Sequence, residues 1–251
     1  MNKGDDKMTT TTKQDKPARR QYRVDGKRVP GVTTILGVLD KPALVGWAAR
    51  TAADAAVDAC ANGMPPDAAK EVGRKAVFAR RDKAADLGTR AHAFVEAHFA
   101  GEQVTVNLTD EDDATVYACA KRAIDHIERT CTRVVLSETA YTSPMGFGGT
   151  LDLVVERDGQ LLIADLKTGK GVHDEVVPQL AAYRFLLSCA NVTVEGGLVF
   201  HVPVDGDEVT EHVIPSHKLD AGWRLFDCAL TIYQVRKGAR LIDGKDADDA
   251  P

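Results

Sequence analysis

Apolar residues recur at helical spacing in several long stretches of the chain. Apolar positions three and four residues apart predict an amphipathic helix with one face turned to a core. Residues 68–101 fit one or two such helices, and the stretch that begins at residue 42 ends at the helix-stopping pair Asn62-Gly63. The predicted helices cover residues 42–63, 68–101, 110–131, 174–190 and 217–238.

Shorter runs rich in β-branched residues, bounded by turn residues, predict strands between these helices. Residues 133–143 predict a single strand. Residues 21–29 predict a small hairpin around Asp25-Gly26, and residues 196–214 predict another around Asp205-Gly206. With a further hairpin at the centre of the chain, the order is helices, three strands, a helix, two strands and a helix. This order predicts an α/β fold with a mixed sheet and helices packed on it.

The central hairpin, residues 149–170, carries ionisable side chains among its apolar ones. Residues 158–159 are Asp-Gly, the preferred pair for a type I′ turn. Centred there, the turn places Asp152 directly opposite Asp165, with Cβ atoms about 5 Å apart on one face. Lys167 lies two residues after Asp165 and therefore points to the same side.

One face of this hairpin is wholly apolar and is expected to be the core side; its residues are Leu151, Leu153, Val155, Leu162, Ala164 and Leu166. The other face gathers Asp152, Asp165 and Lys167 toward one end. Two facing carboxylates repel each other, but a divalent cation between them turns that cost into a binding site, since Mg²⁺ prefers carboxylate oxygens and water. The alternative is a solvated face with acids by chance, and a register slip of one residue would remove the pairing.

Composition and charge add limits rather than a function. The chain has 251 residues, of which 44% are hydrophobic and 27% charged, which is an ordinary soluble composition with enough length for one core. A net charge of -5 gives no overall sign of nucleic-acid binding, while the local basic run at residues 74–83 is either a solvated helix face or a phosphate track. No apolar run approaches the length of a membrane span, so no membrane partner and a cytoplasmic location are expected.

Short patterns in the chain resemble the PD-(D/E)XK nuclease superfamily. Residues 148–152 read G-G-T-L-D, and residues 165–167 on the next strand read D-L-K. Two further patterns resemble the RecB-like branch of that superfamily: residues 87–96, which contain G-T-R-A-H, and residues 179–183, which read Q-L-A-A-Y. Residues 30–50 resemble the start of phage exonucleases in the CRISPR-associated RecB-like family.

The resemblance implies a restriction-endonuclease-like core, with a mixed sheet flanked by helices and an N-terminal helical region. It implies a single nuclease domain over residues 21–240, with a helical part at 30–131 and the catalytic α/β core at 132–240. The polar, Thr-rich residues 1–20 and the acidic residues 241–251 predict disordered tails.

The resemblance also implies a metal site. Asp152 and Asp165 would hold one or two Mg²⁺ or Mn²⁺ ions, His92 would ligate from its helix, and the backbone carbonyl of Leu166 would be a further ligand. Lys167 would orient or help deprotonate a metal-bound water and offset the charge that develops during hydrolysis.

Three other residues are candidates for lining this site. Glu96 lies four residues after His92 and shares its helical face, so it could hold a metal-bound water, orient a neighbour or simply be solvated. Gln179 and Tyr183 are also four apart, and the resemblance implies that they line the site and contact nucleic acid. The alternative for them is an ordinary pair on a helix surface.

The function implied is that of a metal-dependent DNA nuclease. Within that class, the resemblance favours an exonuclease of phage recombination or DNA processing. The alternative is a non-catalytic nucleic-acid-binding module that keeps the fold, although such a module has no need of all the acids and the lysine. An interaction protein of the replication machinery would need an exposed apolar patch, and the sequence predicts none.

DNA is the expected partner, with a homo-oligomer or a recombination partner protein left open. No iron–sulfur cluster is expected. Members of that family with a cluster carry a tight group of cysteines late in the chain, and here only Cys228 lies late.

Overall fold

The computed structural model describes residues 21–238, so both predicted tails, residues 1–20 and 241–251, lie outside the described residues. The helices are α1 (Val32–Leu36), α2 (Pro42–Ala61), α3 (Pro66–Phe99), α4 (Glu111–Thr130), α5 (Val176–Cys189) and α6 (Ser216–Gly238). The strands are β1 (Tyr22–Val24), β2 (Lys27–Val29), β3 (Arg133–Ser143), β4 (Phe147–Arg157), β5 (Gln160–Lys167), β6 (Gly196–His201) and β7 (Thr210–Pro215). The predicted order of helices and strands is confirmed, and residues 68–101 form one long helix rather than two.

The main sheet has the strand order β3-β4-β5-β6-β7, and β1 and β2 form a small sheet of their own. Only β5 and β6 are parallel, joined through α5, while the other neighbours are antiparallel. The mixed sheet flanked by helices is therefore confirmed. The predicted hairpin at residues 196–214 is antiparallel, and its connection is eight residues long, residues 202–209, around Asp205-Gly206.

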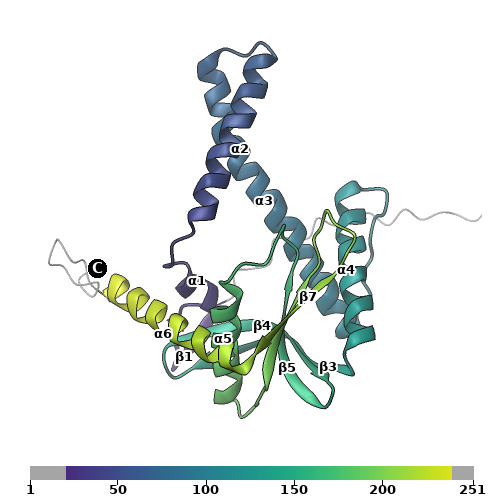
Figure 1. Cartoon of the computed structure of the whole chain (residues 1–251), viewed down its shortest axis with the longest axis vertical. Helices are drawn as coiled ribbons and strands as arrows, with labels where there is room; N and C mark the ends of the chain where they lie inside the picture. The colour runs from purple at the N-terminus through teal and green to yellow at the C-terminus, as the bar shows by residue number, and fades with distance from the viewer. Residues whose placement is uncertain (1–20, 239–251) are drawn as a thin grey trace, which may run out of the picture.

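Helices cover both faces of this sheet (Figure 1). On one face, α1, α5 and α6 enclose a core that includes Leu180 and Phe226; on the other, α3 and α4 enclose a second core that includes Val95 and Ile124. The expectation of one core face and one polar face on the central hairpin is wrong, because both faces are buried. The parallel β5–β6 pair explains this, since a crossover helix covers the face of the sheet that a simple hairpin would leave in water.

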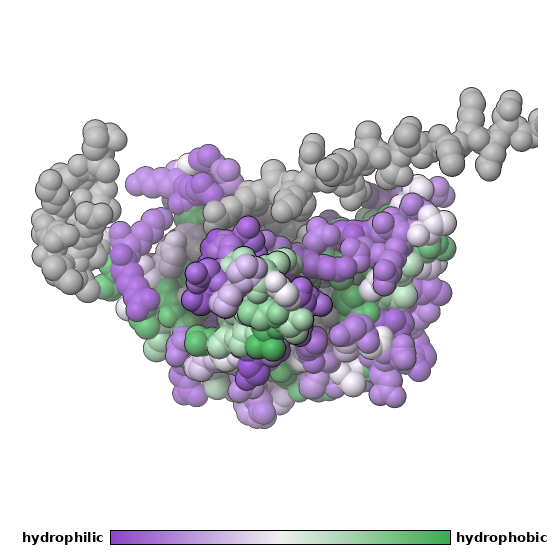
Figure 2. Space-filling model, turned by 90° about the horizontal axis from the view of Figure 1, so that it is seen from above, coloured by the Kyte–Doolittle hydropathy of each residue, from purple (hydrophilic) through white to green (hydrophobic). Residues whose placement is uncertain are grey.

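Helix α2 and the first half of α3 form an arm that projects from the rest of the molecule (Figure 1). The two helices approach closely at Gly73, where an added Cβ would lie 2.4 Å from the carbonyl oxygen of Ala52. Large apolar side chains stay exposed along the arm: Leu44, Val45, Val57, Met64, Val72 and Phe78. Figure 2 looks onto the free end of the arm, where apolar side chains gather among hydrophilic ones. Such exposed apolar surface was not expected from the sequence.

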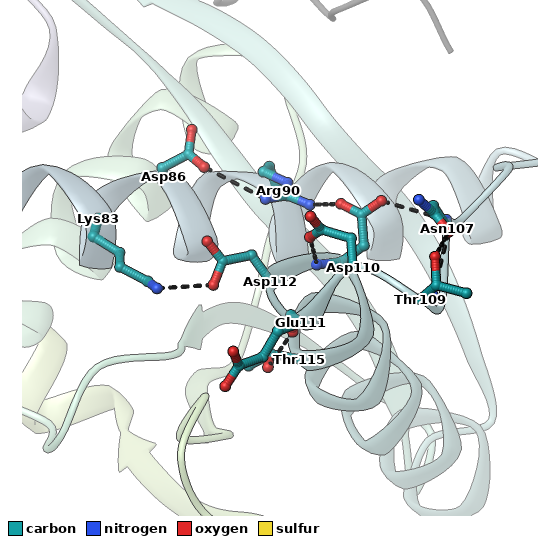
Figure 3. A network of polar contacts seen from close by, with 10 residues as sticks. Lys83, Asp86, Arg90, Asn107, Thr109, Asp110, Glu111, Asp112 and Thr115 are labelled. Atoms are coloured by element: carbon teal, nitrogen blue, oxygen red, sulfur yellow. Dashed lines mark hydrogen bonds and ion pairs between the residues drawn. The ribbon is translucent and has the colours of Figure 1, made fainter. Parts of the chain in front are cut away.

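Polar contacts hold the base of the arm in place. Arg90 of α3 lies between Asp86, 3.5 Å away, and Asp113 of α4, while Lys83 lies 2.9 Å from Asp112 (Figure 3). Ion pairs at a surface are individually weak, but this group joins the middle of α3 to the first turn of α4. It therefore fixes the direction in which α3 runs from the arm to the sheet. Among the described residues, no helix combines the length and apolar character that crossing a membrane requires.

Candidate active site

The turn of the central hairpin is as predicted, but its ladder is shorter. Asp158 and Gly159 have φ values of 52° and 76°, as a type I′ turn requires. The predicted register holds from the turn as far as the pair Leu153–Ala164 and ends there. The expected backbone pair between Asp152 and Asp165 is therefore absent from the ladder. The reason is local: the backbone N–H of Leu166 donates to Asp152 Oδ2 at 3.0 Å, so a side chain takes the place of a strand partner.

A third acid lies on the other side of Asp152. The β3–β4 register pairs Thr139 with Leu151 and Ser137 with Leu153, which puts Glu138 opposite Asp152. Glu138 has a φ of 44°, a left-handed conformation that is costly for a residue with a Cβ. Strained backbone of this kind persists where the surrounding structure holds it, often at functional sites. Three adjacent strands thus bring one acid each to the same part of the sheet.

Glu138, Asp152 and His92 form a group with the geometry of a cation site. One potential ligand atom from each lies within 4.8 Å of the others. His92 reaches the group from α3, with Nδ1 3.4 Å from Asp152 Oδ2. A cavity of about 10 Å³ lies here, lined by His92, Val95, Glu96, Ser137, Glu138, Asp152, Leu153 and Leu166. That volume is the size of a single small occupant, such as a water or an ion.

The second acid of the hairpin belongs to a different set of contacts. Asp165 is 1% exposed, and Lys167 Nζ lies 2.7 Å from its Oδ2. Gln179, from α5, donates through Nε2 to Asp165 Oδ1 at 2.9 Å and accepts from Lys167 Nζ at 3.3 Å. Burial alone would lower the pKa of Lys167, but the charge and hydrogen bond of Asp165 outweigh it and raise that pKa. Lys167 is therefore held as an ammonium group in a fixed place.

Asp152 connects the two sets. Burial raises its pKa, and the charge of Asp165 raises that pKa further, while His92 and Lys167 act in the opposite direction. The pKa of Tyr183 is raised too, first by burial and then by the charges of Asp152 and Asp165, so its phenol stays neutral. The carboxylates repel one another, and little water is present to screen their charges. A bound cation would relieve this repulsion.

Two glycines before Asp152 make room for tyrosines at the back of the site. An added Cβ at Gly149 would lie 2.6 Å from Cε1 of Tyr183, and one at Gly148 would lie 2.7 Å from Cβ of Tyr22. Tyr22 comes from β1, and its hydroxyl is 3.0 Å from Oγ1 of Thr150. The G-G-T pattern is thus explained by close packing: β4 can carry no side chain where α5 and the small sheet press on it.

Replacing Gly149 with Ala should lower the free energy of unfolding by about 1–3 kcal/mol, the usual cost of overpacking a core. The added methyl group has to displace the buried ring of Tyr183. Urea unfolding of both proteins would measure the difference. Gly171→Ala is the matched control, since its Cβ would meet nothing within 4 Å. Equal unfolding midpoints for Gly149→Ala and Gly171→Ala would contradict this account of the pattern.

The structure brings most of the predicted site residues into one region. His92, Glu96, Asp152 and Leu166 line the cavity, and Asp165, Lys167 and Gln179 are mutually bonded beside it. Tyr183 is 5% exposed and lies at the back of the site, and its contact with nucleic acid stays a prediction.

Sequence reasoning missed Glu138. The signal for it was the tight connection from Ser143 to Phe147, because those two residues pair. Counting back along both strands from that pair places Glu138 opposite Asp152.

Comparisons with known proteins agree with this architecture. The family model of the PD-(D/E)XK nuclease superfamily matches residues 68–225, which is more than half of the chain. The chain belongs to this superfamily, and its mixed sheet flanked by helices is the restriction-endonuclease-like fold. No curated protein matches the chain.

Eighteen chains of solved structures match. One, from Eubacterium rectale and named "Putative exonuclease", is 6% identical with a TM-score of 0.43, and the match covers 61% of this chain and 66% of that one. Another, SSO0001, is 16% identical with a TM-score of 0.30, and the match covers 58% of this chain and 85% of that one.

Proposed function

We propose that this chain is a divalent-cation-dependent nuclease that hydrolyses phosphodiester bonds in DNA. The observation that carries the proposal is the convergence of acids from three adjacent strands, Glu138, Asp152 and Asp165, with the imidazole of His92 and the ammonium group of Lys167. An ion-pair network that served stability alone would balance its charges more closely than three acids against one lysine do. Cations and phosphates are the partners that such an arrangement suits.

The residues present fit a hard divalent cation such as Mg²⁺ or Mn²⁺. The donors are carboxylate oxygens with one imidazole, and the carboxylates are poorly hydrated. His92, Glu138 and Asp152 would hold the ion, with Asp165 and the carbonyl of Leu166 as further ligands. Asp165 keeps free lone pairs for this role, because each of its oxygens has one partner. When bound, such a cation lowers the pKa of a coordinated water and offsets the charge of the phosphate.

Lys167 supplies the second positive charge. Asp165 and Gln179 hold its Nζ from two sides, so the ammonium group has a fixed place beside Asp152. Fixed charge aimed at the position where negative charge develops stabilises a transition state without reorganisation. Lys167 therefore orients the attacking water and stabilises the phosphate oxygens as their charge grows. Gln179 is a positioning residue for both Asp165 and Lys167.

The narrower assignments rest on the resemblance of the chain to RecB-like phage enzymes. On that basis we propose DNA as the substrate, exonuclease action, and a role in phage recombination or DNA processing within a host cytoplasm. We also propose that residues 21–240 act as a single nuclease domain. A homo-oligomer or a recombination partner protein is compatible with this role.

Incubation with end-labelled linear and closed circular DNA, with and without Mn²⁺, tests the proposal. The expected result is loss of the linear DNA only when Mn²⁺ is present, with the closed circle left intact. Cleavage of the closed circle would replace exonuclease with endonuclease action. Binding of DNA without cleavage in any divalent cation would contradict the catalytic proposal and leave a binding module.

Mn²⁺ should raise the melting temperature, and the rise should grow as the pH increases from about 4, the ordinary pKa of an aspartate. The raised pKa of Asp152 means that the folded chain keeps a proton which the unfolded chain has lost, so without a cation this carboxyl contributes less stability as the pH rises. A cation competes with that proton, so its effect follows the opposite trend.

Thermal unfolding from pH 5 to 8, with and without Mn²⁺, gives the measurement. Asp152→Asn should reduce both the Mn²⁺ effect and its pH dependence. A Mn²⁺-induced rise that shrinks with increasing pH would show that the cation binds elsewhere.

A further inference from the structure

The face of α3 that carries His92 continues onto the arm. α3 is one helix from Pro66 to Phe99, and at 100° per residue Arg81 lies within about 20° and Phe78 within about 40° of the direction of His92. At 1.5 Å per residue, these two positions are about 16 Å and about 21 Å along the helix from His92. The arm therefore presents this pair on the same side of the helix as the candidate cation site.

Phe78 and Arg81 form an exposed aromatic and cationic pair. Phe78 is 47% exposed, and the guanidinium carbon of Arg81 lies 5.2 Å from the centroid of its ring. Arg81 also pairs with its neighbour Asp82 at 2.8 Å, but both side chains are more than half exposed. An exposed pair of this kind contributes little, so a phosphate can compete for the guanidinium group.

Small residues separate this pair from the site. Ala85 and Gly88 lie between Arg81 and His92 on the same side of the helix. Gly88 lies against the segment that follows Lys167, since an added Cβ there would be 2.8 Å from Oγ1 of Thr168. Between Arg81 and His92 this side of α3 thus carries small residues, and at Gly88 it contacts the segment that follows Lys167.

We propose that Phe78 and Arg81 bind single-stranded DNA that extends from the active site, with a base stacked on Phe78 and a phosphate on Arg81. Exposed aromatic rings with adjacent cations are the means by which proteins bind unpaired strands without reading sequence. For a strand that keeps the stacked rise of about 3.4 Å per nucleotide, the distance from His92 corresponds to about five or six nucleotides. This inference rests on the proposed nuclease function for its substrate. Of the basic run at residues 74–83, it assigns phosphate binding to Arg81 alone.

The rest of that run is less suited to the role. Arg74 and Lys75 share Glu71, at 2.7 Å and 3.7 Å, and Lys83 is joined to α4. Arg80 is adjacent to Arg81 but lies about 100° around the helix from it, away from the direction of the site. Arg80→Ala is therefore a matched control for Arg81→Ala, with the same loss of charge on the same exposed helix.

The test measures DNA binding without cleavage. Fluorescence anisotropy in EDTA measures the dissociation constants of the wild type, Phe78→Ala, Arg81→Ala and Arg80→Ala. The labelled DNAs are single strands of 4 and 20 nucleotides and a blunt duplex. Phe78→Ala should weaken binding of the 20-mer about tenfold and leave the 4-mer unchanged. Arg81→Ala should reduce the slope of log affinity against log salt by about 0.7, the value for one phosphate on a single strand.

Equal affinity of the 20-mer for Phe78→Ala, Arg81→Ala and the Arg80→Ala control would overturn the inference. So would an equal loss for the 4-mer, or a larger loss for a blunt duplex than for the single strand. Because binding is measured in EDTA, the two proposals fail separately. If the chain never cleaves DNA but the variants weaken binding of the 20-mer alone, the arm contact stands and the nuclease proposal fails. If the chain cleaves DNA and neither variant changes binding, the nuclease proposal stands and the arm contact fails.

Discussion

Replacing Lys167 with Ala is expected to reduce DNA cleavage at least about a hundredfold, the usual effect of removing one charge-stabilising group from an active site. Lys167 contacts Asp165 at 2.7 Å, and its charge also lowers the pKa of Asp152 on the neighbouring strand. Loss of the ammonium group leaves the phosphate oxygens without fixed positive charge on that side. The rate of cleavage of end-labelled linear DNA in Mn²⁺, per folded molecule, is the measurement.

Folding has to be separated from catalysis in this experiment. Lys167→Ala leaves the carboxylate of Asp165, 1% exposed, without its ion-pair partner, and an unpaired buried charge destabilises the fold. Lys167→Met keeps the bulk of the side chain and gives a second test, while Lys218→Ala removes an exposed lysine of α6 and should change neither stability nor rate. Cleavage at the wild-type rate by a folded Lys167→Ala protein would remove this lysine from the mechanism.

The central hairpin shows how far local pattern reaches. Its turn and the register up to Leu153 and Ala164 follow from Asp-Gly chemistry and could be predicted. The end of the ladder could not, because it depends on the side chain of Asp152 accepting a hydrogen bond from the backbone N–H of Leu166. The break also changes the faces: Leu151 packs in the core of α5, while Leu153 packs in that of α3 and α4. Strict alternation would have put both in one core.

Features that depend on segments far apart in the chain were harder to predict from the sequence. His92 lies 60 residues before Asp152, and only the resemblance to RecB-like nucleases linked them. The helical pattern predicted both helices of the arm but not their projection, because amphipathic spacing does not say which partner a helix has. Of the residues of α2, only Thr51 is buried, and its many alanines allow a helix with little core. Glu138 could be found only from the register of β3 on β4, counted back from the pair Ser143–Phe147.

Replacing Glu138 with Gln should have two effects of opposite sign. Without a divalent cation, the free energy of unfolding should rise by up to about 1 kcal/mol, because two carboxylates on facing positions of adjacent strands repel each other. The affinity for the divalent cation should fall at least about tenfold, because an amide oxygen replaces a charged ligand. Changing a residue that only orients a metal ligand already lowers metal affinity by about that factor. Cleavage in Mn²⁺ should fall with it. Urea unfolding in EDTA and calorimetric titration with Mn²⁺ measure the first two quantities.

The opposite signs make this variant informative, because a residue with only a packing role would lose stability when altered and would not affect cation binding. Glu102→Gln is the control: it removes the same charge from an exposed loop and should change neither quantity. A Glu138→Gln protein that binds Mn²⁺ as the wild type does would remove Glu138 from the proposed ligands. The left-handed backbone at Glu138, with φ of 44°, would then have to be explained by the packing of β3 alone. Weaker Mn²⁺ binding with greater stability in EDTA would instead mean that the strain serves to direct this carboxylate to the cation.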